Sequence, residues 1–436
     1  MNKKIMFLGL GVVGQSLMEL LLENHVFSIE DMFVVDFDEN AFEFYLERGG
    51  KKDNCLQLEM DSTNYMQVFA NLSVGDFLLC MADGNDSLIL ANECADRGIH
   101  FVSASDDTFD DVEDDEPFRY RTHFYEYKAL MGRSAGLATG VLQFGVNPGL
   151  VSLFTKKVLI DVVDNDEGEF VSSKRSGLKE LAKAGKFPEL ARELGVRCFT
   201  ESDLDTTKAD IIEKVNTVYS TWNVPDFDGE SNDRSIIKVG TLDSLTSILN
   251  RIGVSADDVF YYNKDDGTLV LDLLGKNVKV KSFSADQAYE GSLDAHEEVF
   301  TIHDYYVVRK EDGKIEYAPS VLFVYRPCDL AINSVLHGTN EEYQLITKDK
   351  MTSGGEAVGI CVHGDNFKSR YAGTALCLDK NRFETPSVFL VSVSVFAAIK
   401  FILGHPNEGT LFPEYLPVEE ILSYVSPYLP IISNEL

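Results

Sequence analysis

The sequence lacks the long apolar run that a membrane helix needs. No segment approaches the roughly 20 apolar residues of a membrane span. The start, "MNKKIMFLGLGVVG", has the basic and then apolar character of a signal peptide, but three glycines interrupt it and no A-x-A site follows. We therefore expect neither a signal peptide nor a membrane partner.

Paired cysteines are also missing. The seven cysteines are scattered, with no CxxC pair and no histidine cluster beside them. This pattern is typical of a reducing compartment and argues against disulfides and structural zinc. The sequence therefore predicts a cytoplasmic protein, and it predicts no metal site.

Positive charge is scarce. Lysine and arginine number 39 against 71 aspartates and glutamates, which gives a net charge of −32. Such a surface repels nucleic acid and anionic membranes, so we expect no nucleic-acid partner. It attracts cations, although an acidic surface most often serves solubility alone. A length of 436 residues exceeds one hydrophobic core and predicts two domains.

The N-terminal segment "KKIMFLGLGVVGQSLMELLLEN" carries the clearest motif. It reads as a buried strand over 4–8, a turn with Gly9, Gly11 and Gly14, and an amphipathic helix. In a dinucleotide-binding turn the first glycine permits the turn, the second lets the backbone approach a pyrophosphate, and the third lets helix pack on strand. The helix N-terminus then faces the phosphates. The alternative is a tight strand–helix turn that binds no nucleotide.

An acid follows at the position that grips the ribose hydroxyls of NAD. The second strand, "MFVVDFD", ends in Asp36, with Asp38 as the less favoured candidate. A carboxylate there repels a 2′-phosphate, so the sequence favours NAD over NADP. Further positions expected at the nucleotide come from the helix start and from the ends of later strands: Val12, Val13, Asp61, Ala82 and Asp83.

Strands and helices alternate along the first third of the chain, which predicts a doubly wound, Rossmann-like parallel sheet. Strands are expected at 55–61, 76–83 and 99–105, a helix at 88–98, and an acidic loop at 106–117. Beyond residue 160 the pattern predicts an α+β domain with a mixed sheet. Its strands are expected at 195–200, 213–222, 257–262, 268–284, 298–309 and 320–326.

The domain boundaries follow from this change of pattern. We predict an α/β chain with an NAD-binding domain over 1–150 and a substrate and dimerisation domain over 151–387. The apolar segment 387–406 predicts a buried helix that ends at Gly404 and Pro406. Because this helix is too apolar to stand alone, we expect the segment 388–436 to pack back onto the first domain.

Several segments give the chain a resemblance to a known family. They are "FGVNPGLVSLFTKK", "ELARELGVRCFTESDLDTT", "VNTVYSTWNVPDFDGE", "AHEEVFTIHDYY", "YRPCDLAINSV", "EAVGICVHG" and "PYLP". In order and approximate spacing, the chain resembles the bacterial homospermidine synthases of the saccharopine dehydrogenase-like group. The resemblance implies that NAD takes a hydride from one putrescine and returns it to the coupled imine, with release of ammonia. It also implies a homodimer.

The resemblance implies roles for particular residues of this chain. Trp222 would line the diamine site as a π face over an ammonium. His296 would act as proton shuttle. Asn147 would hold the nicotinamide or the substrate. The carboxylates expected to bind substrate nitrogens are Asp107, Asp203, Glu230 and Glu356. Asp107 and Asp203 stand where the family has glutamate.

Structural interpretations of the same residues remain open. Trp222 can be a core residue, His296 a salt-bridged surface residue, and Asn147 a turn residue before Pro148. Asp226 and Asp228 are interpreted as turn residues.

Two other functional classes remain. One is an amine or amino-acid dehydrogenase of the saccharopine or carboxynorspermidine type, which needs a basic clamp for a carboxylate. The other is a catalytically idle NAD-binding homologue. The family's histidine-rich continuation after the Trp222 segment is replaced here by "SNDRSIIKVGTLD", so the sequence supports NAD binding better than the choice of amine.

Overall fold

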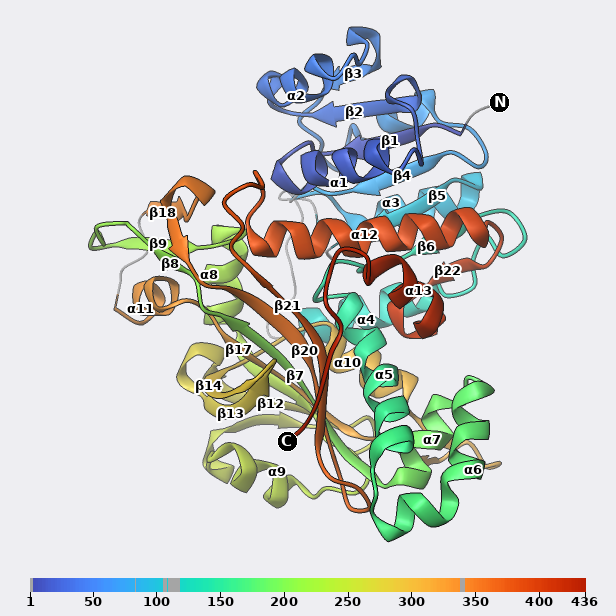
Figure 1. Ribbon diagram of the computed structural model, residues 1–436, viewed down its shortest axis with the longest axis vertical. Helices are drawn as coiled ribbons and strands as arrows, with labels where there is room; N and C mark the ends of the chain where they lie inside the picture. The colour runs from blue at the N-terminus through green and yellow to red at the C-terminus, as the bar shows by residue number, and fades with distance from the viewer. Residues whose placement is uncertain (1–2, 83, 105–107, 109–117, 338–341) are drawn as a thin grey trace. The chain divides into compact units, whose positions relative to one another are not determined.

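The computed structural model describes residues 3–82, 84–104, 108, 118–337 and 342–436 (Figure 1). The chain forms two compact units. The first comprises Met1–Leu150 and Val388–Tyr428, and the second comprises Val151–Ser387 and Leu429–Leu436. The domain boundaries predicted from the sequence describe parts that would fold independently, and they stay a prediction. The last eight residues differ from that scheme, because β23 (Ile432–Glu435) pairs with β21 (Arg370–Cys377) of the second unit.

The first unit is built on a seven-stranded parallel sheet in the order β22-β6-β5-β4-β1-β2-β3. This confirms the predicted Rossmann-like sheet. Its strands are β1 (Ile5–Leu8), β2 (Met32–Asp36), β3 (Cys55–Gln57), β4 (Phe77–Cys80), β5 (His100–Ser103), β6 (Thr139–Val141) and β22 (Gly409–Leu411). Its helices are α1 (Val12–Glu23), α2 (Phe42–Glu47), α3 (Ser87–Arg97), α4 (Arg119–Ala129), α12 (Pro386–Gly404) and α13 (Val418–Val425).

Segments distant in sequence complete this unit. Strand β22 joins the sheet edge beside β6, and the Ser392 hydroxyl of α12 donates to the backbone carbonyl of Val13 in α1. The expectation that no segment approaches the length of a membrane span was wrong for α12, which is long and apolar enough to cross one, with a mean hydropathy of 2.2. However, 72% of its most apolar stretch is buried inside the protein. It packs as the core helix of a folded unit does. The acidic loop 106–117 lies outside the described residues except for Thr108.

The second unit contains the predicted mixed sheet (Figure 1). This sheet has ten strands. Its main path runs β11-β12-β10-β17-β7-β20-β21-β23, and β14 pairs with β13 and β17. The strands not yet given are β7 (Val196–Asp205), β10 (Arg234–Lys238), β11 (Val259–Tyr262), β12 (Thr268–Leu274), β13 (Lys279–Ser284), β14 (Gln287–Asp294), β17 (Ser320–Arg326) and β20 (Gly355–Gly364). The main helices are α5 (Leu150–Asn165), α6 (Glu169–Lys183), α7 (Phe187–Leu194), α8 (Val224–Asn232), α9 (Leu245–Ile252), α10 (Glu298–Tyr305) and α11 (Asp329–His337).

Short strand pairs flank this sheet. They are β8 (Lys208–Ala209) with β19 (Met351–Ser353), β9 (Thr217–Ser220) with β18 (Glu342–Leu345), and β15 (Val308–Arg309) with β16 (Ile315–Tyr317).

Two secondary-structure predictions in this unit were wrong. The expected strand 298–309 is mostly helix α10, whose first six residues are all buried. A helix buried on every side shows no polar stripe, so its sequence does not display helical periodicity. The expected strand 268–284 is two strands, β12 and β13, separated by a single 3₁₀ turn at Gly275–Asn277.

The central sheet of the second unit has one apolar face. Buried side chains from its strands and from α9 form a core there, which includes Cys198, Ile237, Leu293, Leu322 and Val324. Residues on these strands alternate between faces, so their sequence neighbours point to the opposite side. That opposite side carries the polar groups described below.

Candidate active site

The glycine turn after β1 has the geometry of a nucleotide-binding loop. Gly9 has φ +84°, and a Cβ there would lie 2.5 Å from the Cβ of Ala82. A Cβ on Gly14 would lie 2.8 Å from the carbonyl oxygen of Gly9. Gly11 is different, because a Cβ there meets no atom of the described residues within 4 Å. Packing therefore requires Gly9 and Gly14, whereas Gly11 borders open space at the start of α1.

The N-terminus of α1 offers donors to an anion. Gly11 is its N-cap and provides no side-chain cap, so the first helical N–H groups are left for a ligand. Val12 follows with 43% of its surface exposed, and Val13 is half-buried. This is the arrangement expected for a pyrophosphate on the positive end of the helix dipole.

Asp36 ends β2 beside this turn. Its carboxylate accepts from the backbone N–H of Leu10 at 2.8 Å and from that of Asp38 at 3.0 Å. The acid is therefore fixed against the glycine turn, next to where a ribose would follow the pyrophosphate. Asp38 instead accepts from the backbone N–H of Asn40 in its own turn, at 2.9 Å. This agrees with Asp38 being the less favoured candidate for the ribose hydroxyls.

The other residues predicted to lie at the nucleotide have different surroundings in the structure. Ala82 follows β4 and lies against Gly9. Asp61 accepts from the Thr63 hydroxyl and backbone N–H, and these bonds lower its pKa. Asn147 is half-buried and precedes Pro148 through a cis peptide bond. Asp83 and Asp107 lie outside the described residues.

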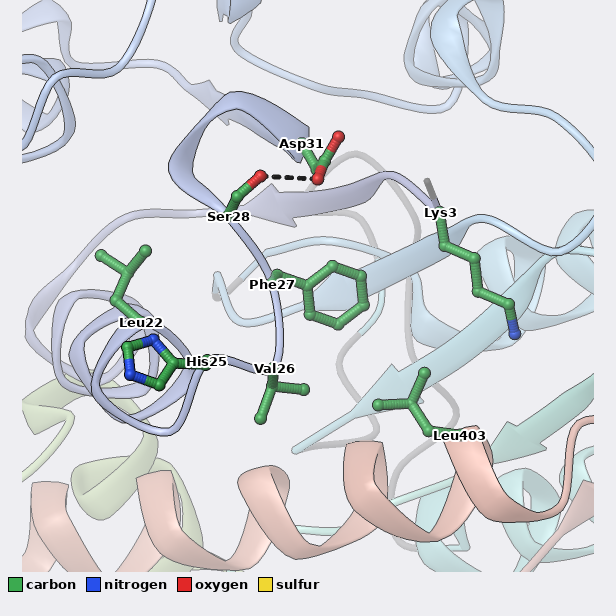
Figure 2. A pocket seen from close by; sticks show the side chains of 8 residues that line it. All are labelled: Lys3, Leu22, His25, Val26, Phe27, Ser28, Asp31 and Leu403. Atoms are coloured by element: carbon green, nitrogen blue, oxygen red, sulfur yellow. Dashed lines mark hydrogen bonds between the residues drawn. The ribbon is translucent and has the colours of Figure 1, made fainter. Parts of the chain in front are cut away.

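A pocket of about 480 Å³ opens elsewhere in the first unit (Figure 2). Lys3, Phe27, Ser28 and Leu403 are among the side chains that line it. Lys3 precedes β1, whereas the glycine turn follows it, so this pocket lies at the opposite edge of the sheet. It is separate from the candidate nucleotide site.

In the second unit, strand β7 presents a row of acids. Glu201, Asp203 and Asp205 alternate with Ser202 and Leu204, so the three acids share one face. They are 0%, 4% and 4% exposed. Buried carboxylates are costly unless they are paired with cations or keep a proton. This row is therefore the strongest chemical feature of the unit.

Trp222 lies beside the middle of this row. Its indole Nε1 donates to the hydroxyl of Tyr325 at 3.2 Å, and Tyr325 is the cross-strand partner of Asp203. The ring is half-buried, unlike the surrounding core residues. This placement suits a wall of a site better than the interior of a core. Burial and the nearby Asp203, Asp205 and Glu356 raise the pKa of Tyr325 well above its ordinary value.

The acids after Trp222 form part of a helix, which corrects the interpretation of Asp226 and Asp228 as turn residues. The Asn223 side chain caps α8 by accepting from the backbone of Asp226 at 3.0 Å. Asp228 is buried and accepts from the Tyr343 hydroxyl at 3.0 Å. Glu230 lies two turns along the same helix and is half-buried.

His296 is salt-bridged, but it is not a surface residue. It is 5% exposed, contacts the Phe323 ring at 4.6 Å, bonds Glu298 through Nδ1, and has Glu297 at 3.3 Å. Burial opposes its charge, yet Glu298, Glu297 and Glu201 outweigh that effect and raise the pKa of His296 well above its ordinary value. The surrounding carboxylates thus favour the protonated form of the imidazole.

The ligand atoms of Glu201, His296 and Glu298 lie within 4.8 Å of one another. Two carboxylates and a neutral imidazole would suit a divalent transition ion, but the protonated imidazole that is favoured here does not. The two carboxylates suit an ammonium group, because its hydrogen-bond donors seek such acceptors.

Asp205 has a second acid opposite it. Glu356 on β20 is its cross-strand partner and is 7% exposed. Burial, and then the neighbouring Asp205, raise the pKa of Glu356 to about 8. Burial likewise raises the pKa of Asp205, against hydrogen bonds from Thr207 and Thr221. Two adjacent carboxyl groups of this kind share a proton in the absence of a cation.

Asp294 adds a further buried carboxyl group at the end of β14. It is 2% exposed, and burial raises its pKa to about 7 despite Lys279 and His296. Its cross-strand partner Phe323 is in turn the partner of Glu201. The register therefore places Asp294 on the same face as the β7 row.

These pKa shifts predict a stability that falls with rising pH. Glu356 keeps in the folded state a proton that the unfolded chain releases near pH 4.3. Its contribution is present below that pH and is lost as pH rises through about 8. We expect the Tm to fall between pH 5 and 9, and Glu356→Gln to remove roughly 5 °C of that fall, measured by scanning calorimetry.

The matched control is Glu290→Gln. Glu290 is an exposed acid on β14 of the same unit, and its replacement should keep the wild-type slope. A Glu356→Gln variant with an unchanged slope would show that Glu356 is ionised at neutral pH in the folded protein.

Sequence reasoning missed four residues of this face: Glu201, Asp205, Asp294 and Tyr325. A signal for two of them was present, because "TESDLD" alternates acid with non-acid at the period of a strand. Asp294 and Tyr325 carried no such signal, since only the strand register places them beside β7.

Comparisons with known proteins agree with this geometry. Residues 5–134 match the family model described as "Saccharopine dehydrogenase NADP binding domain". The chain is 22% identical to a homospermidine synthase of Blastochloris viridis, covering 98% of this chain and 89% of that protein. It is also 22% identical to one of Mesorhizobium japonicum, covering 98% and 88%.

Solved structures show the same fold. A homospermidine synthase of Legionella pneumophila, solved in complex with NAD, has a TM-score of 0.85 at 20% identity and covers 100% of this chain and 92% of its own. The apo saccharopine dehydrogenase of Saccharomyces cerevisiae has a TM-score of 0.52 at 12% identity, with both chains fully covered. The predicted fold class and the resemblance to homospermidine synthases are confirmed.

Proposed function

We propose that this chain is a homospermidine synthase that couples two putrescine molecules with NAD and releases ammonia. The observation that carries the proposal is the buried acidic face of the second unit, bordered by Trp222, in a chain whose first unit carries a dinucleotide-binding turn. Similarity to homospermidine synthases over nearly the whole chain supports it.

The substrate's charge matches this face. Both amines of putrescine are protonated at pH 7, because their pKa is close to that of lysine, about 10.4. Asp203 and the Asp205–Glu356 pair supply carboxylates for ammonium groups, and Trp222 supplies a π face. Iminium intermediates also carry positive charge and gain from the same groups. Bound NAD supplies the acceptor and later the donor of one hydride.

Proton removal requires a group that is free to accept a proton at neutral pH. The carboxylates around His296 raise its pKa and favour its protonated form, so His296 donates a proton more readily than it accepts one. Asp294, with its pKa raised to about 7, is better matched to this role. We therefore assign general-base function to Asp294 and keep His296 as the proton shuttle that the resemblance implies.

The test is direct. Purified protein incubated with NAD and putrescine is expected to yield homospermidine and ammonia, detected by mass analysis, without net NADH formation. Stoichiometric NADH and a keto-acid-dependent product would instead indicate an amine dehydrogenase of the saccharopine or carboxynorspermidine type. No product and no NADH would indicate an idle homologue.

Cofactor preference follows from Asp36. Its carboxylate would meet the 2′-phosphate of NADP, so we expect NAD to bind at least about tenfold more tightly. Asp36→Ser should narrow the difference by removing that repulsion. Titration calorimetry measures the affinities of NAD and NADP for the native chain and for the variant. Tighter binding of NADP by the native chain would contradict the assignment of Asp36.

We further infer a cytoplasmic homodimer. No disulfide joins the seven cysteines, all of which lie in the described part of the chain, and this supports a reducing compartment. The dimer is the habit of the family that the chain resembles. Analytical ultracentrifugation tests the dimer, and a monomer at micromolar concentration would contradict it.

A further inference from the structure

The pocket at the amino end of β1 has apolar walls and one cation (Figure 2). Its volume of about 480 Å³ falls within the roughly 300–1,000 Å³ of small-molecule sites. Leu22, Val26 and Leu403 line it and are half-buried, and the lining residue Phe27 is buried. Figure 2 shows the Phe27 ring at the centre, with Lys3 beside it. A ligand in this pocket would therefore meet apolar side chains and an ammonium group.

The Lys3 side chain reaches from the start of β1 to a buried histidine on β5. Strand β4 lies between them, and Lys3 Nζ is 5.6 Å from the ring centre of Phe77 on β4. The ring of His100 packs 4.6 Å from that of Phe77, and Phe27 contacts the same ring at 5.4 Å. Lys3 Nζ lies 3.5 Å from Nε2 of His100. The two nitrogens therefore meet beside the wall of the pocket.

Both of these nitrogens are hydrogen-bond donors. Nδ1 of His100 accepts from the backbone N–H of Thr139 at 3.1 Å, so Nδ1 carries no proton. Burial, and then the charge of Lys3, lower the pKa of His100 to about 4, so its ring is neutral at pH 7. The one ring proton is therefore on Nε2. Since an ammonium only donates, two donors face each other, and each requires an acceptor.

The acids nearby are engaged with other donors. Asp76 accepts from the backbone N–H groups of Lys4 and Ser73, one at each carboxylate oxygen and both at 2.8 Å. Asp31 lines the pocket and accepts from the Ser28 hydroxyl at 2.6 Å. Within the described residues, the contacts of the Lys3 ammonium are His100 and the Phe77 ring. His100 is 1% exposed, so a buried donor points at a cation rather than at an acceptor.

We propose that this pocket binds a small monocarboxylic acid with an apolar chain, whose carboxylate accepts from Nζ of Lys3 and Nε2 of His100. A carboxylate brings two acceptor oxygens to the two donors, and its bond to the ammonium is charge-assisted. The apolar chain would be removed from water by the four apolar side chains that line the pocket. The glycine turn follows β1 and Lys3 precedes it, so this is an additional site and not part of the nucleotide site.

Charge limits the ligand to a single anionic group. Asp31 also lines the pocket, and the chain as a whole carries a net charge of −32. Both repel a second anionic group on the ligand. Inorganic phosphate gains nothing from the apolar walls. A dicarboxylate and phosphate should therefore bind more weakly than a monocarboxylate of matched length.

The first experiment measures ligand affinity for the full-length chain by ligand-observed NMR titration, with NAD present at saturation. The probes are hexanoate, butanoate, hexanamide, adipate and inorganic phosphate. We expect hexanoate to bind most tightly, about fifteenfold more tightly than butanoate, because each buried methylene contributes about fourfold. Hexanamide should bind at least about tenfold more weakly, because it lacks the charge. Equal binding of hexanoate and hexanamide, tighter binding of phosphate or adipate, or no binding of hexanoate would overturn the proposal.

The second experiment locates the site with Lys3→Met, which keeps an unbranched apolar side chain and removes the ammonium. Hexanoate affinity should fall at least about tenfold, while hexanamide and NAD affinities stay unchanged. Lys4→Met is the matched control, because Nζ of Lys4 donates to the Asn71 carbonyl at 2.9 Å and lies over the Phe33 ring. The control should change neither affinity. An equal loss of hexanoate binding in both variants would show a general effect of charge and refute the site.

The histidine is tested by His100→Asn, which retains an acceptor for the Thr139 N–H and removes the Nε2 donor. Hexanoate should bind more weakly to this variant by about fivefold or more, with hexanamide less affected. Unchanged hexanoate affinity in a folded His100→Asn variant, checked by circular dichroism, would remove His100 from the site and overturn the proposal as stated. If this variant does not fold, the ligand series and Lys3→Met still decide.

Discussion

Gly11→Val is expected to abolish NAD binding while leaving the fold intact. Gly11 has φ −65° and ψ −170°, a conformation that valine adopts without strain. Within the part of the chain that the structure describes, a Cβ there meets no atom within 4 Å. The added side chain would therefore fill only the space through which a pyrophosphate approaches the backbone. We expect affinity to fall about 100-fold or more, close to 3 kcal/mol, by titration calorimetry.

Two control variants test this prediction. Gly177→Val in α6 places the same side chain at a helical glycine that also has open space around it, and NAD affinity should be unchanged. Gly14→Val should instead lower the Tm, because its Cβ would collide with the Gly9 carbonyl at 2.8 Å. If Gly11→Val binds NAD normally, the turn does not hold a dinucleotide.

Replacing Trp222 is expected to reduce activity on diamines more than stability. Trp222→Phe keeps a weaker π face, and Trp222→Ala removes the cation–π contribution of about 0.5–2 kcal/mol and admits water. Activity should fall roughly tenfold in the first and further in the second, with NAD affinity retained. A core tryptophan would behave differently, because its loss to alanine costs about 3–5 kcal/mol of stability.

The half-buried ring and its bond to Tyr325 allow a matched control. Tyr325→Phe keeps the ring and removes only the hydroxyl that orients the indole, so its effect should be smaller than that of Trp222→Ala. Glu230→Gln should weaken a diammonium ligand more than a monoamine and leave the fold unchanged.

Fluorescence gives a direct readout, because Trp222 is the sole tryptophan. An emission unaffected by saturating putrescine, together with an unfolded Trp222→Ala variant, would place the ring in the core and remove it from the site.

Local sequence was enough to predict the structure where an element or motif occupies a short run of consecutive residues. The strand, the three glycines and helix α1 occupy consecutive residues, and each glycine has a distinct steric reason that the structure bears out in Gly9 and Gly14. Helix α12 was also predictable, since its 19 residues are long and apolar enough to exclude a strand.

Local sequence failed where burial hid periodicity. In α10 the residues from Glu298 to His303 are all buried, and Glu298 and His303 themselves are polar. The helix therefore has no polar face that would show helical periodicity, and its sequence was interpreted as a strand. The acids Asp226 and Asp228 suggested a turn, yet the Asn223 cap and the packing of α8 make the segment helical. In both cases tertiary contacts outweighed composition.

The sequence by itself determined the Rossmann-like first unit, the acid at the end of β2 and the family resemblance, because each depends on residues close together or in a fixed order. Only the tertiary structure decided which acids share a face. Asp294, Glu201 and Glu356 lie on three strands whose register no local pattern encodes. The same packing decided that the pKa of the buried His296 is raised rather than lowered, because three carboxylates from β7 and the start of α10 surround it and outweigh its burial.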